Sequence, residues 1–156
     1  MFGKLKSDEI EEVFHHNFLG RLGCHADNMT YVVPISYGYD GKYVYGHANE
    51  GLTVKMMRKN PEVCFEVETM ENMANWKTVI GWGTFEQLDN KEACRKAADV
   101  LNHKALPFVA SETAHLSPDW PFTVDVTGVG GIFFRILLHE KTGRFETPSV
   151  DSCFAS

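Results

Sequence analysis

The arrangement of strand-forming runs constrains the fold of this chain more than any other feature. From Pro61 to Thr69 polar and apolar residues alternate, which places Val63, Phe65 and Val67 on one face of a half-buried strand. The sequence holds about six such runs with helices interspersed, and it lacks the strict strand–helix alternation of a parallel α/β sheet. We therefore predict a small antiparallel sheet or barrel with peripheral helices.

The other runs carry signals that place them within such a sheet. Asp40-Gly41 is a hairpin turn signal between two of them. Pro34 has no N–H to donate, so the strand that holds it lies at a sheet edge or carries a bulge. Gly20 and Gly23 indicate a bulge or a close backbone approach in the first run. These runs are Phe18 to Cys24, Tyr31 to Tyr37, Lys42 to Gly46, Trp76 to Leu88 and Ile132 to His139.

Capping residues predict where two of the helices begin. Ser7 is a good N-cap, and the acidic residues that follow it suit the first turn of a helix. Asp89 and Glu92 form a pair resembling a capping box at the start of another helix, from about Asn90 to Asn102. The residues expected to face the core are Ile10, Val13 and Phe14 in the first helix, and Ala93, Ala97, Val100 and Leu101 in the other.

A third helix is predicted just after the strand that ends at His47. Asn49 can cap this helix, which runs from about Glu50 to Lys59. Asn60-Pro61 ends it, because the residue before a proline avoids the helical region. The chain therefore passes from a strand into a helix start within two or three residues.

The start of this helix is the stretch most suited to binding an anion. Its first-turn N–H groups and the helix dipole attract negative charge. Gly51 lets a phosphate approach the backbone closely, and Thr53 adds a hydroxyl group. Lys55, Arg58 and Lys59 are expected to add local positive charge. An ordinary capped helix with a solvated basic face explains the same residues without any ligand.

Two other residue types have both a functional and a structural interpretation. His47 could donate to a phosphate or to a bound organic acid, or it could bond a backbone carbonyl at the end of its strand. Trp76, Trp82 and Tyr37 could flank a planar ring, although aromatic residues on strands more often lie in a core or an interface. The residues alone leave these alternatives open.

Composition excludes several classes of function. The chain has 156 residues, which suits one domain over residues 1–156. Its 15 basic and 21 acidic residues give a net charge of −6, which argues against a nucleic-acid partner. No run of 18 apolar residues is present, so no membrane helix is expected. We expect tails at 1–6 and 145–156, and a loop or lid at 103–121, where three prolines occur.

The cysteines indicate a reducing compartment. Cys24, Cys64, Cys94 and Cys153 are widely spaced and form no CxxC pair, which argues against a metal site built on thiolates. The N-terminus turns acidic before any apolar run, unlike a secretory signal. We therefore expect buried thiols, a cytoplasmic location and no bound metal.

Several short stretches, taken in order and spacing, carry a resemblance over residues 8–144. They are Gly20-Arg21-Leu22-Gly23, Tyr31 to Tyr39, His47 with Gly51, Arg58 to Phe65, Thr78 to Glu86, Phe134-Arg135-Ile136 and Thr142-Gly143-Arg144. The chain resembles the pyridoxamine 5′-phosphate oxidase-like flavoproteins of the FMN-binding split-barrel superfamily, and within them the nitroimidazole-resistance-type branch. The resemblance implies a six-stranded antiparallel split β-barrel with peripheral helices. It also implies a homodimer with two FMN sites at its interface, each built from both chains.

The resemblance also implies roles for individual residues. The backbone of Val33 to Ser36 is expected to run along the isoalloxazine edge. The helix start from Gly51 to Thr53 is expected to hold the phosphate, and the strand with Thr78 and Val79 to touch the flavin. His47 takes the place of a histidine that faces the flavin and its substrate, so it is expected to be both a cofactor contact and the catalytic residue. The expected cofactor-binding residues are Val33, Pro34, Ile35, Ser36, His47, Gly51, Leu52, Thr53, Thr78 and Val79.

Thr53 departs from the pattern of the family. Proteins of this kind usually carry a lysine there, which pairs with the phosphate. Lys55 lies two residues on, roughly 200° around the helix, so it does not substitute. The missing charge-assisted bond corresponds to about 1.5–3 kcal/mol, which is about tenfold to a hundredfold in affinity.

The function implied is an FMN-dependent oxidoreductase, a reductase of a small planar acceptor such as a nitroaromatic. A pyridoxamine 5′-phosphate oxidase proper is the alternative among enzymes, but it needs a second basic cluster for a phosphorylated substrate. A non-catalytic protein that binds flavin or haem is the alternative of another class. A structural dimer that lost its cofactor when position 53 changed is a further one.

Overall fold

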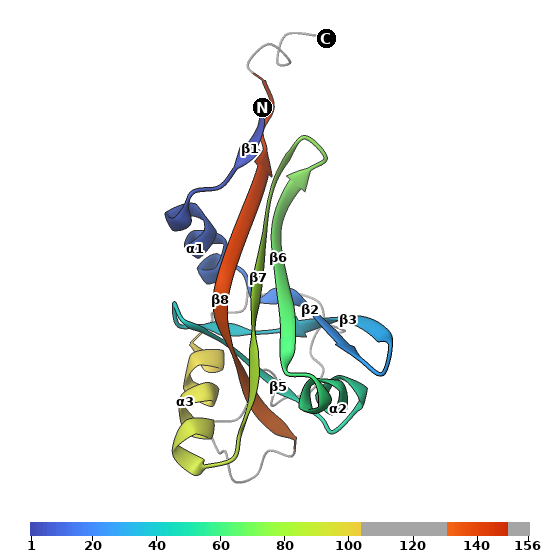
Figure 1. Ribbon diagram of the computed structural model, residues 1–156. Coiled ribbons are helices and arrows are strands. Elements are labelled where there is room, and N and C mark those ends of the chain that lie inside the picture. Colours follow the sequence, from blue (N-terminus) through green and yellow to red (C-terminus); the bar gives the residue numbers. More distant parts are fainter. Residues whose placement is uncertain (104–130, 150–156) are drawn as a thin grey trace, which may run out of the picture.

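The computed structural model describes residues 1–103 and 131–149, so nearly all of the predicted loop or lid at 103–121 lies outside the described residues. The described chain is mostly strand (Figure 1). Its elements are β1 (Phe2–Lys4), α1 (Ser7–His16), β2 (Leu19–Ala26), β3 (Met29–Ser36), β4 (Gly38–Tyr39), β5 (Tyr43–Ala48), α2 (Leu52–Lys59), β6 (Glu62–Asn72), β7 (Asn75–Leu88), α3 (Lys91–Asn102) and β8 (Ile132–Glu146).

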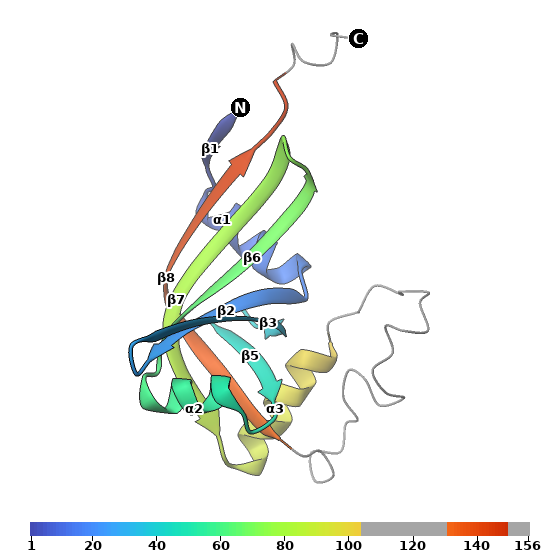
Figure 2. The same ribbon diagram turned by 90° about the vertical axis from the view of Figure 1, so that its right-hand side faces the viewer.

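The strands form one curled antiparallel sheet. Its order is β3-β2-β6-β7-β8-β5-β4, and β1 pairs with the C-terminal part of β8. Strands β3 and β5 lie far apart in this order but contact each other, so the sheet closes on itself as a split barrel (Figure 2). The predicted fold class is confirmed. The sheet has eight strands instead of six, because two short strands, β1 and β4, join its edges.

The hairpins differ in part from the prediction. Strand β3 pairs with β2 through a turn at Asp27-Asn28, where both residues have positive φ (51° and 61°), as a type I′ turn requires. The predicted turn at Asp40-Gly41 joins the two-residue β4 to β5 instead. Pro34 does lie on an edge strand, as its missing donor requires.

The two predicted tails are wrong where they meet the sheet. Phe2–Lys4 forms β1 and pairs with Arg144 to Glu146, so residues 2–4 and 145–146 belong to strands. Strand β8 runs well past His139, the predicted end, because β7 pairs with it as far as Glu146. A register shift at Trp82/Gly83 lets these two long strands bend (Figure 1).

The helices lie where they are predicted, with different caps. The N-cap of α1 is Lys6 rather than Ser7. The backbone N–H of Lys6 donates to the Glu9 carboxylate at 2.8 Å. Helix α2 begins after Gly51 rather than at Glu50, and α3 is capped by the Asn90 side chain instead of Asp89. No helix of the described ranges is long and apolar enough to cross a membrane.

Two apolar clusters lie on opposite faces of the sheet. The larger one fills the inside of the curl, where Phe65 and Leu22 are fully buried and α1 and α2 contribute Phe14 and Met57. The smaller one lies under α3 around Tyr45 and contains Leu88, Leu101 and Phe133. Neighbours along a strand point to opposite faces, so Val44 joins the larger cluster while Tyr45 joins the smaller.

Candidate functional site

The edge strand β3 presents a backbone edge beside the barrel opening. The side chains of Val33 and Ile35 pack against the larger core, while Pro34 is exposed and Ser36 half-buried. Strand β3 pairs with β2 on one side and is the last strand of the sheet order on the other. Among the described residues, its outer N–H and C=O groups are therefore not used by a neighbouring strand.

His47 lies near the end of β5, on the face that turns toward α3. Its residue partner across the sheet is Phe133 of β8, and the two rings are 4.6 Å apart with an interplanar angle of 53°. Gly131 approaches the imidazole from the chain that enters β8. The ring of His47 is thus half-buried and has contacts on more than one side.

The start of α2 is open to a ligand. No side-chain cap closes it in the described structure, and its N-cap, Gly51, has extended backbone (φ −162°) that any residue adopts. A Cβ at Gly51 would meet only the Asn49 carbonyl oxygen, at 3.8 Å, so packing does not demand glycine there. Leu52 is half-exposed and Thr53 half-buried. The first-turn N–H groups can therefore reach an anion.

Two of the three basic residues of α2, Arg58 and Lys59, are paired with acids, which corrects the expectation that they add free positive charge at this start. Lys55 is exposed. Arg58 pairs with Glu50 and donates to the Gln87 side-chain oxygen at 2.9 Å. Lys59 pairs with Asp27 at 2.5 Å. Both belong to the last turn, but Glu50 directly precedes the N-cap Gly51, so the Arg58–Glu50 pair brings a neutralised charge to the start of the helix. The attraction for an anion there comes from the N–H groups and the dipole.

Thr78 and Val79 point to opposite faces of β7. Val79 is fully buried in the larger core, so only its backbone can meet a ligand. The Thr78 hydroxyl donates to Glu66 at 2.8 Å on the outer surface of the sheet. Arg21 donates to both Glu66 and Glu68 there, at 3.2 Å each.

The predicted residues therefore form two groups within one chain. Strand β3 contacts β5, and β5 leads through a short connection into α2. Val33–Ser36 lies on one of the contacting strands, and His47 and Gly51–Thr53 lie at and after the end of the other; we call these residues the seam. Thr78 is separated from β3 by β2 and β6, which corresponds to about 14 Å at the usual strand spacing. One chain alone does not bring the seam and Thr78 together.

The surface around Thr78 also holds a shallow groove that the sequence did not reveal. In register across five strands lie Val32, Gly23, Cys64, Trp82 and Glu140. They line a groove of about 430 Å³, because Gly23 has no side chain to fill it. We call the surface from Val32 to Glu140, with the Arg21–Thr78 network beside it, the outer face.

The predicted aromatic residues have different positions. Trp82 is 38% exposed and lines the groove of the outer face. Tyr37 is buried and donates its hydroxyl to the Phe14 carbonyl at 2.7 Å, so it does not flank a planar ligand. Trp76 donates to Glu146 at 3.0 Å and packs edge-on against Phe2.

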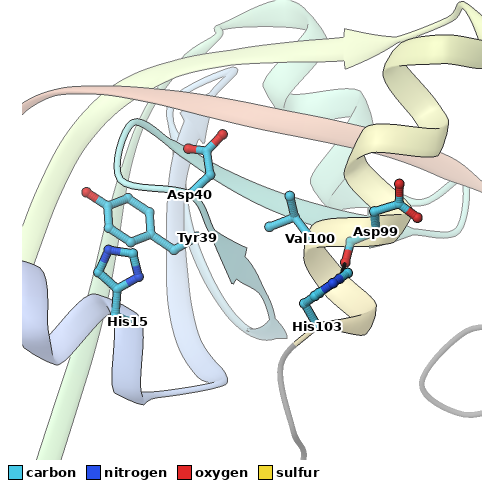
Figure 3. Close-up of a pocket in the computed structure, with 6 residues that line it drawn as sticks. All are labelled: His15, Tyr39, Asp40, Asp99, Val100 and His103. Atoms are coloured by element: carbon cyan, nitrogen blue, oxygen red, sulfur yellow. Dashed lines mark hydrogen bonds between the residues drawn. The ribbon is translucent and has the colours of Figure 1, made fainter.

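A cavity of about 440 Å³ lies between α1, β4 and α3, away from the seam (Figure 3). Its lining residues are His15, Tyr39, Asp40, Asp99, Val100 and His103. The His15 and Tyr39 rings are 4.8 Å apart, and the Tyr39 hydroxyl turns away to Glu11 at 2.6 Å and Lys141 at 2.7 Å. Burial raises the pKa of Tyr39, so this hydroxyl stays protonated.

Asp40, at the edge of this cavity, stabilises the turn between β4 and β5. It accepts the backbone N–H groups of Tyr43 and Lys42 at 2.7 and 3.0 Å, and the Tyr45 hydroxyl at 3.1 Å. Burial alone would raise the pKa of this carboxyl, but these hydrogen bonds lower it below its usual value. Asp40 therefore closes the β4–β5 turn.

Sequence reasoning missed the residues that surround His47. Phe133 was read as part of a strand, and Gly131 precedes it without any motif. The signal available was a glycine directly before a strong strand, which is common at bends and says nothing about its partner. The Arg21 network was missed for the same reason, because it forms only when β2, β6 and β7 pair.

Comparison with known proteins gives consistent matches over most of the chain. The model of a family described as pyridoxamine 5′-phosphate oxidase matches residues 6–131. An uncharacterised protein of Rhizobium meliloti is 28% identical over 153 residues, which cover 92% of this chain and 95% of that protein.

Two solved structures share the fold. A FAD-binding protein of Mesorhizobium loti is 28% identical with a TM-score of 0.73, and the match covers 95% of this chain and 98% of that one. A candidate 5-nitroimidazole antibiotic resistance protein of Bacteroides thetaiotaomicron is 18% identical with a TM-score of 0.69, covering 93% and 87% of the two chains. The likeness to the second is one of fold.

Proposed function

This chain belongs to the pyridoxamine 5′-phosphate oxidase family, and we propose that it is a flavin-binding protein that uses FMN to reduce a small planar acceptor. The family supports a flavin, and so does the structural neighbour from Mesorhizobium loti, which is described as FAD-binding. The further step to a reductase rests on the residues of the seam.

The seam is the observation that carries the proposal. The open start of α2 offers N–H groups to a phosphate, and the outer edge of β3 offers backbone donors and acceptors to a planar ring. Strand β3 contacts β5, and the chain passes from β5 into α2 within a few residues, which would place the two features near each other. The residues present thus fit a flavin mononucleotide: Gly51, Leu52 and Thr53 would hold its phosphate, and Val33 to Ser36 its ring edge.

A bound flavin supplies the redox chemistry, and the protein supplies position and polarity. His47 would orient the acceptor, because an imidazole donates or accepts a proton near neutral pH. The outer backbone groups of β3 would hold the ring edge without charged side chains. Thr53 would give the phosphate a neutral hydroxyl in place of the usual ammonium group.

The proposal includes a homodimer in which the outer face of one chain meets a second copy. Val32 is 62% exposed and Trp82 is 38% exposed on this face, and Leu137 is 37% exposed nearby. An exposed apolar surface of this kind commonly marks an interface. Pairing would bring Thr78 of one chain toward the seam of the other, which a single chain cannot do.

The proposal also includes a cytoplasmic location, supported by the state of the thiols. Cys24, Cys64 and Cys94 are free cysteines. Burial raises the pKa of Cys24 and of Cys94, which keeps them as unreactive thiols. Cys24 is buried and the other two are half-buried. Free thiols are usual in a reducing compartment.

Titration with three candidate cofactors tests the binding step. The purified protein is mixed in turn with FMN, FAD and haem, and absorbance and melting temperature are followed. We expect blue-light absorption and a higher melting temperature with FMN. A response to FAD alone would identify FAD instead of FMN as the cofactor. A Soret band with haem alone would favour a haem-binding protein. No response to any of the three would favour a structural protein without a cofactor.

Reduction of the loaded protein tests the reaction step. We expect NADH or NADPH to bleach the bound flavin and a nitroaromatic acceptor to restore its colour. Oxidation of pyridoxamine 5′-phosphate would favour the alternative oxidase. If dithionite bleaches the flavin and neither nicotinamide does, the protein is not a self-sufficient reductase.

A further inference from the structure

The imidazole of His47 is enclosed by the chain that enters β8. In the β5–β8 pairing, His47 lies opposite Phe133 and Ala48 lies opposite Ile132. The Phe133 ring, itself almost completely buried under α3, contacts the imidazole at 4.6 Å between centroids. One side of His47 therefore rests on a fixed aromatic surface.

Gly131 closes a second side of the same imidazole. Its φ is +100°, a conformation that side chains rarely adopt. A Cβ at this position would come within 3.0 Å of both Cε1 and Nε2 of His47, and within 2.8 Å of the Ala48 carbonyl oxygen. Glycine is therefore required both by the backbone conformation and by the space that the imidazole takes.

We propose that Gly131 and Phe133 are positioning residues that set the orientation of the His47 ring. The outer torsion of a histidine side chain is broad and nearly two-fold, so the neighbours of the ring decide which nitrogen faces which way. Gly131 leaves room for the Cε1–Nε2 edge, and Phe133 supports the ring. The inference rests on the proposed function, in which His47 faces the flavin and the acceptor.

The role differs from general packing because it acts through one side chain. Phe133 also belongs to the small cluster under α3, and a purely structural role would be felt there. A positioning role is felt at the imidazole even when stability is unchanged. Displacing a catalytic group by about 1 Å can cost about a hundredfold in rate.

Gly131→Ala is the first variant, with Gly41→Ala as its matched control. Gly41 has nearly the same φ, +96°, but a Cβ there meets nothing within 4 Å. Both substitutions carry the same backbone strain, and only Gly131→Ala meets His47. The flavin-free protein with nitrogen-labelled histidine is used, and the ring-nitrogen NMR signal of His47 is measured, because it reports which nitrogen carries the proton. We expect this signal to move in Gly131→Ala and to stay in place in Gly41→Ala.

Phe133→Leu is the second variant, because Gly131→Ala also presses on the Ala48 backbone. Its control is Phe85→Leu, since Phe85 is similarly buried but lies in the larger core. We expect Phe133→Leu to move the His47 ring-nitrogen signal, because the imidazole loses the surface that holds its orientation, and Phe85→Leu to leave it unchanged. An unmoved His47 signal in both Gly131→Ala and Phe133→Leu overturns the inference.

Activity of the loaded protein separates this inference from the proposed function. If His47 works on the acceptor, the two variants also lower the rate of acceptor reduction by about tenfold or more. If the His47 signal moves and the rate does not, the positioning holds but the role of His47 in the reaction is wrong. If no flavin binds at all, the NMR measurement still decides the positioning.

Discussion

At the scale of residues, Thr53 is the clearest departure from the pattern of the family, which usually has a lysine at this position. The structure places Thr53 in the first turn of α2, where an added ammonium group would face an anion bound by the N–H groups. Arg58 and Lys59 do not compensate, because Glu50 and Asp27 neutralise them. In the proposed site, the affinity for a phosphate would therefore depend on backbone groups and one hydroxyl.

Thr53→Lys is expected to tighten FMN binding by about tenfold to a hundredfold, through a new charge-assisted bond. The measurement is a fluorescence titration of the flavin. Ser7→Lys, which adds the same charge at the exposed start of α1, is the control and should change little. Equal FMN affinities for Thr53→Lys and the unchanged protein would show that the phosphate does not bind at the start of α2.

His47→Ala is expected to keep flavin bound and to lower acceptor reduction, because β3 and α2 supply most of the proposed cofactor contacts. Flavin content and turnover are measured on the same sample. His16→Ala controls for loss of an imidazole, at an exposed histidine whose ring hydrogen-bonds the Glu12 carbonyl of its own helix. Loss of FMN from His47→Ala would make His47 a cofactor ligand instead.

The residues of the site were only partly within reach of the sequence. His47, Gly51 and Thr53 follow one another closely, so the strand-to-helix passage could be predicted locally. The contact of His47 with Gly131 and Phe133 could not, because it depends on the pairing of β5 with β8. The ion pair of Lys59 with Asp27 could not be predicted either, because it links a helix end to a turn that is distant in the sequence.

At the scale of elements, periodicity predicted the long strands and turn chemistry misplaced the hairpins. The alternation of β6 is the clearest case, because Val63, Phe65 and Val67 are all buried as expected. Asp27-Asn28 was overlooked because neither residue is glycine, although both adopt positive φ. Strand β1 has three residues, too few for any period to appear.

The β4–β5 turn gives a prediction for pH. Asp40→Asn removes the charge that accepts two backbone N–H groups, and we expect a loss of about 1 kcal/mol in the free energy of unfolding at neutral pH. The pKa of Asp40 is lowered in the folded state, so its stabilisation is present above the unfolded pKa of about 3.9 and is lost as pH falls through the folded value.

Urea unfolding across pH checks this prediction. The gap between Asp40→Asn and the unchanged protein should narrow below about pH 4. Asp89→Asn, at an exposed carboxylate that accepts a hydrogen bond from the Gln87 side chain, should differ by less than about 0.5 kcal/mol throughout. A gap that is constant from neutral to acid pH would show that the charge of Asp40 does not stabilise the turn.

The pairing of β2 with β6 gives a second prediction at this scale. A Cβ at Gly20 would come within 2.7 Å of the Phe65 ring and 2.9 Å of the Glu66 carbonyl oxygen. Gly20→Ala should therefore destabilise the fold by about 1–3 kcal/mol. Gly51→Ala, with only the Asn49 oxygen at 3.8 Å, is the control for stability. Similar urea midpoints for the two variants would mean that β2 can move away from β6.

At the scale of the whole molecule, the split barrel explains why the predicted site falls into two groups. The seam lies where the curled sheet nearly closes, and Thr78 lies three strands away on the outer face. The same face exposes Val32 and Trp82. The proposed second copy on this face would account for both observations, because it would cover the groove and supply Thr78 to the neighbouring seam.

The measurement that tests this account most directly is sedimentation velocity of the FMN-loaded protein, followed both at a protein wavelength and at a flavin wavelength. The account predicts a single species of two chains that carries the flavin absorbance with it, at about one flavin per chain. A one-chain species that carries flavin would contradict the shared site. Flavin absorbance that stays behind with the solvent would contradict the central claim that this protein binds FMN.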